Sequence, residues 1–149
     1  MNATVWTIGH STRTLDEFVA VLRAHDIEAL VDVRRFAGSR RLPQFNEGAL
    51  RDGLERAGIA YKWLPQLGGR RTPDAESINT GWRHSAFRGY ADHTATEEFA
   101  DGFSELLMLE EGLRTTVMRN EVRVDNVQHV LMGLLKLLDR FGPNDYRTD

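Results

Sequence analysis

The sequence predicts an α/β fold of three layers, in which a mostly parallel sheet is covered by helices on both faces. Short apolar, β-branched runs alternate with segments whose apolar residues recur at helical spacing. Such alternation is expected of parallel strands joined by crossover helices. The run at 29–33 is apolar except for one acid, as in a strand buried on both faces. We assign residues 1–141 to this single domain and residues 142–149 to a flexible tail.

Three strands and two helices are predicted in the first half of the chain. A β-rich run stops at Gly9, and a capping-box pattern from Thr14 to Glu17 begins the first helix. Gly58 ends the second helix, and an alternating run follows it directly. The predicted strands are 4–8, 29–33 and 59–64, and the predicted helices are 15–25 and 46–58.

The second half of the chain begins with a long loop and is mainly helical. A second capping-box pattern from Thr94 to Glu97 begins one helix, and Asp125 is the expected N-cap of another with a continuous apolar face. The predicted segments are a loop at 65–79, a short helix or irregular segment at 82–91, a helix ending near 111, a strand at 114–118 and a helix at 125–142.

The loops after the four strands are rich in glycine, arginine and other polar residues. In a parallel sheet the carboxyl ends of the strands lie at one edge, and ligands bind there. We therefore expect these loops to meet at a single site although they lie far apart in the sequence. The loops contain Gly9-His10-Ser11, Arg34-Arg35, residues 67–71 and residues 119–121.

Four arginines lie within the eight residues from Arg34 to Arg41, directly after the buried strand. Guanidinium groups this close repel one another unless anions lie between them, and their planar fork suits a carboxylate or a phosphate. Any one of these arginines, taken alone, is more often solvated or paired with an acid on a neighbouring helix. The cluster as a whole predicts an anion-binding site.

Several residues are candidates for chemistry at this edge. His10 is placed to act as an acid, a base or a hydrogen-bond donor to a phosphate, or only to cap the following loop. Asp32 is expected to pair with an arginine and to order the site. Gly68 and Gly69 suit an anion cradle, although adjacent glycines more often form a turn. The candidate catalytic residues are His10, Asp32 and Glu121, and the candidate ligand-binding residues are Gly9, Ser11, Arg34, Arg35, Ser39, Arg40, Arg41, Gln44, Gly68, Gly69, Arg70, Arg71, Arg88 and Tyr90.

The charge and composition of the chain exclude several classes of function. Residues 1–90 carry 13 basic and 10 acidic side chains, whereas residues 91–149 carry 6 and 12. A pI of about 6.0 argues against a protein that coats nucleic acid by charge alone. The absence of cysteine excludes thiol catalysis and disulfides, and His84, His93 and His129 show no metal-ligand spacing, so we expect no metal and no cofactor. Without a signal peptide or an apolar span, a cytoplasmic location is expected.

Several blocks of the sequence follow one known pattern in order and spacing. They are residues 7–11, 31–34, 39–40, 43–46, 58–61, 67–70, 87–92 and 96–99. On these blocks, which extend over roughly residues 5–121, the chain resembles the family catalogued as domain of unknown function 488. The resemblance implies a compact α/β domain of Rossmann-like layering. It implies no activity, because none is established for the family.

The chain departs from the family pattern mainly after the last predicted strand. Met118-Arg119-Asn120-Glu121 keeps the methionine and the acid of the family's Met-Cys-x-Glu but lacks the thiol, and no Cys-His-Arg follows. Residues 127–130 either belong to the predicted helix or align with a final family strand, and in the second case a segment is missing. Ala37 stands where the family usually has proline.

The sequence predicts a domain that binds an anionic, phosphate-bearing ligand at the carboxyl edge of the sheet, such as a nucleotide or a nucleic-acid end. Whether it is an enzyme stays open. One alternative is a non-catalytic interaction protein, for example a homodimer in which basic and acidic halves meet. The chain could also be a relative that has lost a cysteine-dependent activity, or a sequence-independent nucleic-acid binder. A further hypothesis is that a deletion or a change of reading frame has altered the C-terminal part of the chain.

Overall fold

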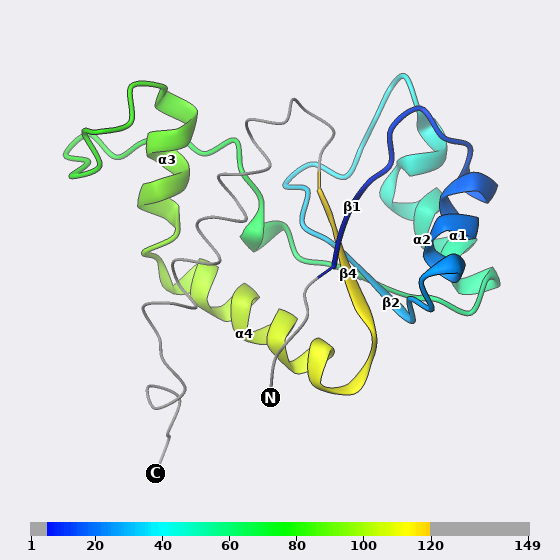
Figure 1. Cartoon of the computed structure of the whole chain (residues 1–149). Coiled ribbons are helices and arrows are strands. Elements are labelled where there is room, and N and C mark those ends of the chain that lie inside the picture. Colours follow the sequence, from blue (N-terminus) through cyan, green and yellow to red (C-terminus); the bar gives the residue numbers. More distant parts are fainter. Residues whose placement is uncertain (1–5, 120–149) are drawn as a thin grey trace, which may run out of the picture.

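The computed structural model describes residues 6–119, which form four strands and four α-helices (Figure 1). The strands are β1 (Trp6–Gly9), β2 (Ala29–Asp32), β3 (Ala60–Trp63) and β4 (Thr115–Arg119). The α-helices are α1 (Leu15–Ala24), α2 (Glu47–Arg56), α3 (Ser85–His93) and α4 (Glu97–Gly112), and two short 3-10 helices are η1 (Pro43–Phe45) and η2 (Pro65–Leu67). None of the helices in this described part is long and apolar enough to cross a membrane.

All four strands run parallel, in the order β1-β4-β2-β3. β4 is last in the sequence but lies between β1 and β2, so β2 becomes a central strand, and all four of its residues are buried. Gly9 pairs with Arg119, and Asp32 pairs with Met118 on one side and Trp63 on the other. The four strands therefore end at one edge of the sheet, as the sequence predicts.

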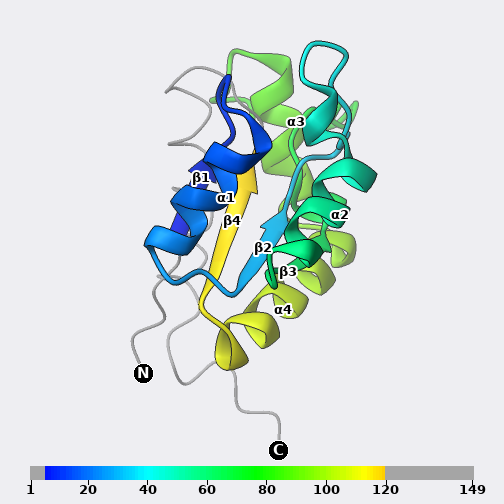
Figure 2. The same ribbon diagram turned by 90° about the vertical axis from the view of Figure 1, so that its right-hand side faces the viewer.

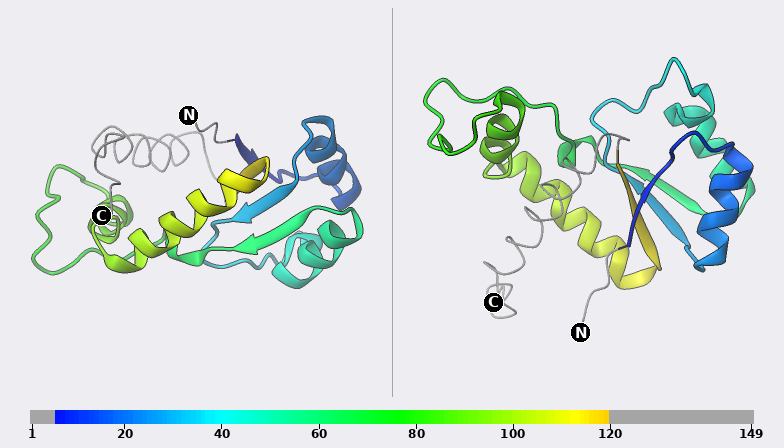
Figure 3. Two further views of the ribbon diagram at one scale, coloured as in Figure 1. Left: turned by 90° about the horizontal axis from the view of Figure 1, so that it is seen from below. Right: turned by 45° about the horizontal axis from the view of Figure 1, so that its top comes forward.

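Helices cover both faces of the sheet, which confirms the predicted three-layer α/β class. α1 and α2 lie side by side in front of the strands in Figure 2, with α4 behind them. The same arrangement, viewed along a different axis, places α4 and α2 on opposite sides of the strands (Figure 3).

The two faces of the sheet bury two separate apolar clusters because side chains alternate along a strand. Leu30 points into the cluster under α1 and α2, whereas its neighbour Val31 points into the cluster under α4. The first cluster is centred on Phe18, Leu22, Phe45, Leu50, Leu54 and Met118, and the second on Val33, Leu64, Leu67, Phe99, Leu106 and Val117. Each fully buried side chain of this kind contributes about 1.5–3 kcal/mol.

Local sequence signals explain the helix boundaries. The predicted capping box at α1 is present, since Glu17 N donates to Thr14 Oγ1 at 3.2 Å and Thr14 N donates to Glu17 Oε2 at 2.8 Å. The prediction for 82–91 is resolved in favour of a helix that begins later, at Ser85. The predicted helix at 125–142 and the tail at 142–149 lie outside the described residues, so the assignment of residues 1–141 to one domain stays a prediction.

Candidate functional site

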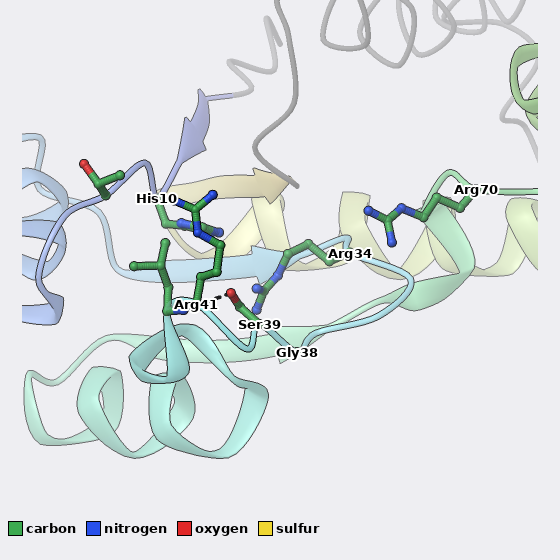
Figure 4. Close-up of a pocket in the computed structure, with 8 residues that line it drawn as sticks. His10, Arg34, Gly38, Ser39, Arg41 and Arg70 are labelled. Atoms are coloured by element: carbon green, nitrogen blue, oxygen red, sulfur yellow. Dashed lines mark hydrogen bonds between the residues drawn. The ribbon is translucent and has the colours of Figure 1, made fainter.

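A pocket of about 280 Å³ lies at the carboxyl edge of the sheet (Figure 4). Three loops that are distant in sequence line it: the loop after β1, the loop after β2 and the loop after β3. The lining residues are His10, Thr12, Arg34, Gly38, Ser39, Arg41, Leu42 and Arg70. The pocket therefore brings together three of the four loops that the sequence predicts to meet, and it contains one imidazole and three guanidinium groups.

His10 follows β1 and is held in a fixed orientation. Its ring stacks on Phe45 with a centroid distance of 4.4 Å and an angle of 16° between the ring planes, and it is 7% exposed. Nδ1 lies 2.8 Å from the carbonyl oxygen of Ser11. Because a carbonyl can only accept, Nδ1 carries the hydrogen, and in the neutral ring Nε2 holds the lone pair.

Asp32 and Arg34 form a buried ion pair at the end of β2. Their exposed fractions are 0% and 2%, and Arg34 Nη2 lies 2.6 Å from Asp32 Oδ2. Arg34 also donates to Asp32 Oδ1 from Nε at 2.8 Å and from its backbone N at 3.0 Å. The sequence predicts that Asp32 pairs with an arginine, and the structure identifies that arginine as Arg34, two residues further along.

Two neighbours complete the surroundings of this ion pair. Tyr61 on β3 donates its hydroxyl to Asp32 Oδ2 at 2.8 Å, and Arg34 Nη2 donates to the carbonyl oxygen of Phe45 at 2.8 Å. Burial, then the charge of Asp32 and the hydrogen bond to it, raise the pKa of Tyr61 well above its ordinary value. Asp32 thus accepts from four donor groups, which fits it for holding Arg34 in place at the pocket.

The loop after β2 is shaped by a hydrogen bond that the sequence does not reveal. Asn46 is the N-cap of α2, but its side chain makes no cap hydrogen bond, and Oδ1 instead accepts from the backbone N of Ser39 at 2.6 Å. Ser39 Oγ in turn accepts from the backbone N of Leu42 at 3.1 Å, so its hydroxyl hydrogen can point elsewhere. Gln44 donates to the carbonyl oxygen of Arg13 at 3.2 Å and joins this loop to the one after β1.

The loop after β3 places Arg70 at the pocket. Its backbone has φ of 60°, a left-handed conformation that is uncommon for a residue other than glycine. Arg35 Nη1 donates to the carbonyl oxygen of Arg70, and a Cβ at Gly68 would lie 2.6 Å from the backbone N of Arg35. Gly68 thus permits the two loops to touch, and that contact by itself requires a glycine.

The charges at the pocket do not cancel. Asp32 balances Arg34, whereas Arg41 and Arg70 are exposed and form no ion pair within residues 6–119. Figure 4 shows Arg70 pointing toward Arg34 from the opposite loop, and Arg41 extending toward His10. With His10 neutral, the described lining residues and Asp32 together carry a net charge of two positive units.

Three of the predicted ligand-binding residues are bound to protein groups away from the pocket. Arg71 donates from Nε to the carbonyl oxygen of Gly68 at 3.1 Å and from Nη2 to that of Pro65 at 3.0 Å. Arg88 donates to the carbonyl oxygen of Trp82, and the hydroxyl of Tyr90 donates to that of Leu67 at 3.1 Å. These side chains hold the 65–84 segment in place. Burial raises the pKa of Tyr90 well above its ordinary value.

The remaining candidates lie beside the pocket or beyond the described residues. Arg40 is exposed and does not line the pocket, and the same holds for Ser11, whose carbonyl holds His10. Gly9 is the last residue of β1 and does not line the pocket. Arg35, Gln44 and Gly69 lie in the segments after β2 and β3 and do not line it either. Glu121 lies outside the described part of the chain. Sequence inspection missed Thr12, Gly38 and Leu42, although Thr12 and Gly38 follow predicted strand ends by four and five residues and Leu42 directly follows the arginine cluster.

Comparison with known proteins identifies one family. The family model described as domain of unknown function DUF488 matches residues 14–133. This range includes β2, β3 and β4 and all three pocket arginines, while His10 lies just before it. No curated protein and no solved structure matches the chain.

Proposed function

The chain belongs to the DUF488 family, whose description assigns no activity, and on that premise we propose that it binds a phosphate-bearing anion in the pocket at the carboxyl edge of its sheet. The observation that carries the proposal is the meeting of Arg34, Arg41 and Arg70 from two different loops on one small pocket. Guanidinium groups donate in a planar fork that matches the oxygens of a phosphate.

The pocket has features of a built site rather than a chance surface depression. Arg34 is fixed by a buried carboxylate, His10 is fixed by a ring stack and a backbone carbonyl, and Ser39 retains a hydroxyl hydrogen for donation. Groups whose rotamers are already fixed lose little conformational entropy when a ligand binds.

His10 is the proton-transfer group that we assign to this pocket, acting through Nε2. Its tautomer is set by the carbonyl of Ser11, and Asp32 does not take that role because it accepts from Arg34 and Tyr61. Asp32 is accordingly a positioning residue for Arg34.

Thermal unfolding with increasing inorganic phosphate tests the binding proposal. Phosphate should raise the Tm of the wild-type chain, since a ligand that binds only the folded state stabilises it by mass action. Arg41→Gln and Arg70→Gln should each reduce this shift strongly, because both side chains line the pocket. Both are exposed, so their loss leaves the core intact. Arg34 is unsuitable for this test because its removal would leave Asp32 buried without its partner.

Arg56→Gln provides the matched control. Arg56 is exposed at the end of α2, just before β3 begins, so it lies at the opposite edge of the sheet and its loss changes the net charge equally. The control should keep the full phosphate shift. Equal shifts in all four proteins would show that phosphate acts through general ionic effects and would refute the proposal.

The same samples test the alternative of an electrostatic homodimer. Its mass should fall from that of a dimer to that of a monomer as the salt concentration rises, since exposed charge pairs are screened within about 10 Å at 0.1 M salt. A constant mass together with an arginine-dependent phosphate shift favours the small-ligand site.

A further inference from the structure

We propose that the preferred ligand is a phosphate monoester, whose terminal phosphate carries two negative charges, rather than a phosphodiester. This inference rests on the proposed function and names the chemical class that the pocket selects. It depends on the count of charges at the pocket, on how each charge is held and on the size of the space between them.

The charges of the described lining residues match a dianion. Arg34 is cancelled by Asp32 at 2.6 Å, and Arg41 and Arg70 remain without an ion-pair partner in the described range. A monoester above its second pKa of about 6 carries two charges and balances both arginines. A diester carries one charge and leaves one guanidinium uncompensated in the complex.

The arrangement of the arginines also favours a phosphate with three free oxygens. Arg34 is 2% exposed and fixed to its carboxylate, so it presents the same face to every ligand. Arg41 and Arg70 are exposed and come from different loops (Figure 4). A terminal phosphate can offer one oxygen to each of three donors, whereas a diester has only two oxygens free of ester linkages.

The size of the pocket limits how much of the ligand it encloses. A volume of about 280 Å³ is below the range of about 300–1,000 Å³ that is usual for drug-sized ligands. A terminal phosphate with a small part of its ester group fills this space. A phosphate inside a polynucleotide would need the chain to enter and leave the pocket, while a terminal phosphate enters from one side.

The pH dependence of binding separates a dianion requirement from the titration of the protein. The titratable and charged groups that face the site are His10 from the loop after β1, Asp32 and Arg34 from β2 and its end, Tyr61 from β3, and Arg41 and Arg70. A change in the charge of any of these protein groups affects the binding of sulfate as well as that of a monoester, so the ratio of the two affinities corrects for it. Sulfate keeps two charges between pH 7.5 and pH 5.0, whereas a monoester loses one below its second pKa of about 6.

The experiment measures the Kd of the full chain for phenyl phosphate, sulfate and dimethyl phosphate by calorimetry at pH 7.5 and pH 5.0. At pH 7.5, dimethyl phosphate should bind about tenfold more weakly than phenyl phosphate, which corresponds to one lost charge-assisted contact. At pH 5.0 the affinity for phenyl phosphate relative to sulfate should fall about tenfold, because about a tenth of the monoester is then dianionic.

Two variants test whether the arginine charges cause this selectivity. Arg70→Gln removes one of the two charges that have no ion-pair partner within residues 6–119 and should bring the monoester and the diester to within about twofold of each other. Arg56→Gln should keep the wild-type preference. Equal affinity of the wild-type chain for monoester and diester, or a monoester-to-sulfate ratio that does not change with pH, would overturn the inference and leave phosphate binding intact. Failure of all three anions to bind would overturn the proposed function as well.

Discussion

Asp32 and Arg34 are the residues on which the geometry of the pocket depends most directly. The carboxylate of Asp32 is 0% exposed and has lost its contact with water, and hydrogen bonds from Arg34 and Tyr61 replace that hydration. Such a pair adds little net stability compared with an apolar pair, but it is expensive to break because a buried charge is then left alone.

We expect Asp32→Asn to reduce the free energy of unfolding by about 3–5 kcal/mol, because the guanidinium of Arg34 would remain buried without its counter-charge. Urea denaturation measures this loss. Glu47→Gln is the control, since it breaks the exposed pair of Glu47 with Arg51 one helical turn away and should cost about 0.3–0.5 kcal/mol. Comparable losses in the two variants would contradict a special role for the buried pair.

Tyr61 and Tyr90 should make the protein sensitive to alkali. In both, the pKa is raised above the ordinary value of 10.0, so above about pH 10 the folded chain keeps two protons that the unfolded chain releases. The free energy of unfolding is therefore expected to fall as the pH rises above 10. Urea titrations between pH 9 and pH 11 should show a shallower decline in Tyr61→Phe and Tyr90→Phe, and an unchanged slope in both would disprove the assignment.

At the scale of single residues, the sequence predicted that a buried charge needs a counter-charge, but it did not predict which groups the arginines contact. It predicted that Asp32 pairs with an arginine, because an acid at the end of a buried strand needs a counter-charge. It did not separate Arg41 and Arg70, which line the pocket, from Arg71 and Arg88, which bind backbone carbonyls. The positions of those carbonyls depend on the tertiary fold, and no local pattern reports them.

At the scale of elements, two glycines allow segments to approach closely. A Cβ at Gly68 would lie 2.7 Å from the carbonyl oxygen of Val33, and a Cβ at Gly89 would lie 2.3 Å from that of Arg71. The first contact joins the loops after β2 and β3, and the second packs α3 against the segment that follows Arg70. The loop that carries Arg70 is thus held at both ends by backbone contacts.

Gly68→Ala is expected to destabilise the fold by about 1–3 kcal/mol, because the added methyl group meets backbone atoms that cannot rotate away. It should also weaken phosphate binding by moving Arg70. Gly48→Ala is the control, since Gly48 is exposed in α2 and an added Cβ would meet open space. This variant should increase the free energy of unfolding by about 0.5–1 kcal/mol. Chemical denaturation measures both changes. A Gly68→Ala variant as stable as the wild-type chain would argue against close packing of the loops after β2 and β3.

The regular elements were predictable because their signals are local. The capping box at Thr14 fixes the start of α1, and the strands β2, β3 and β4 lie within one residue of the predicted runs. The short helices η1 and η2 were not predicted, since three residues carry no periodicity. The beginning of α3 at Ser85 was also not predicted, because its N-cap is the imidazole of His84 rather than a typical capping residue.

At the scale of the whole molecule, the strand order explains how distant residues meet. The parallel arrangement was predictable from the alternation of strands and helices, but the insertion of β4 between β1 and β2 was not. That insertion places β1 at one side of the sheet and β3 at the other, with their following loops on either side of the loop after β2. The pocket is consequently a product of the complete sheet and of no single loop.

An amide NMR titration of the ¹⁵N-labelled full chain with inorganic phosphate tests the central claim most directly. We predict saturable shift changes in three separate stretches, at residues 10–12, 34–42 and 68–70, with a single Kd shared by all three. The exposed surfaces of α1 and α4 should remain unaffected. Shift changes confined to one stretch, spread over the arginines of the whole surface, or centred on α3 and α4 would contradict a shared anion pocket at the carboxyl edge of the sheet.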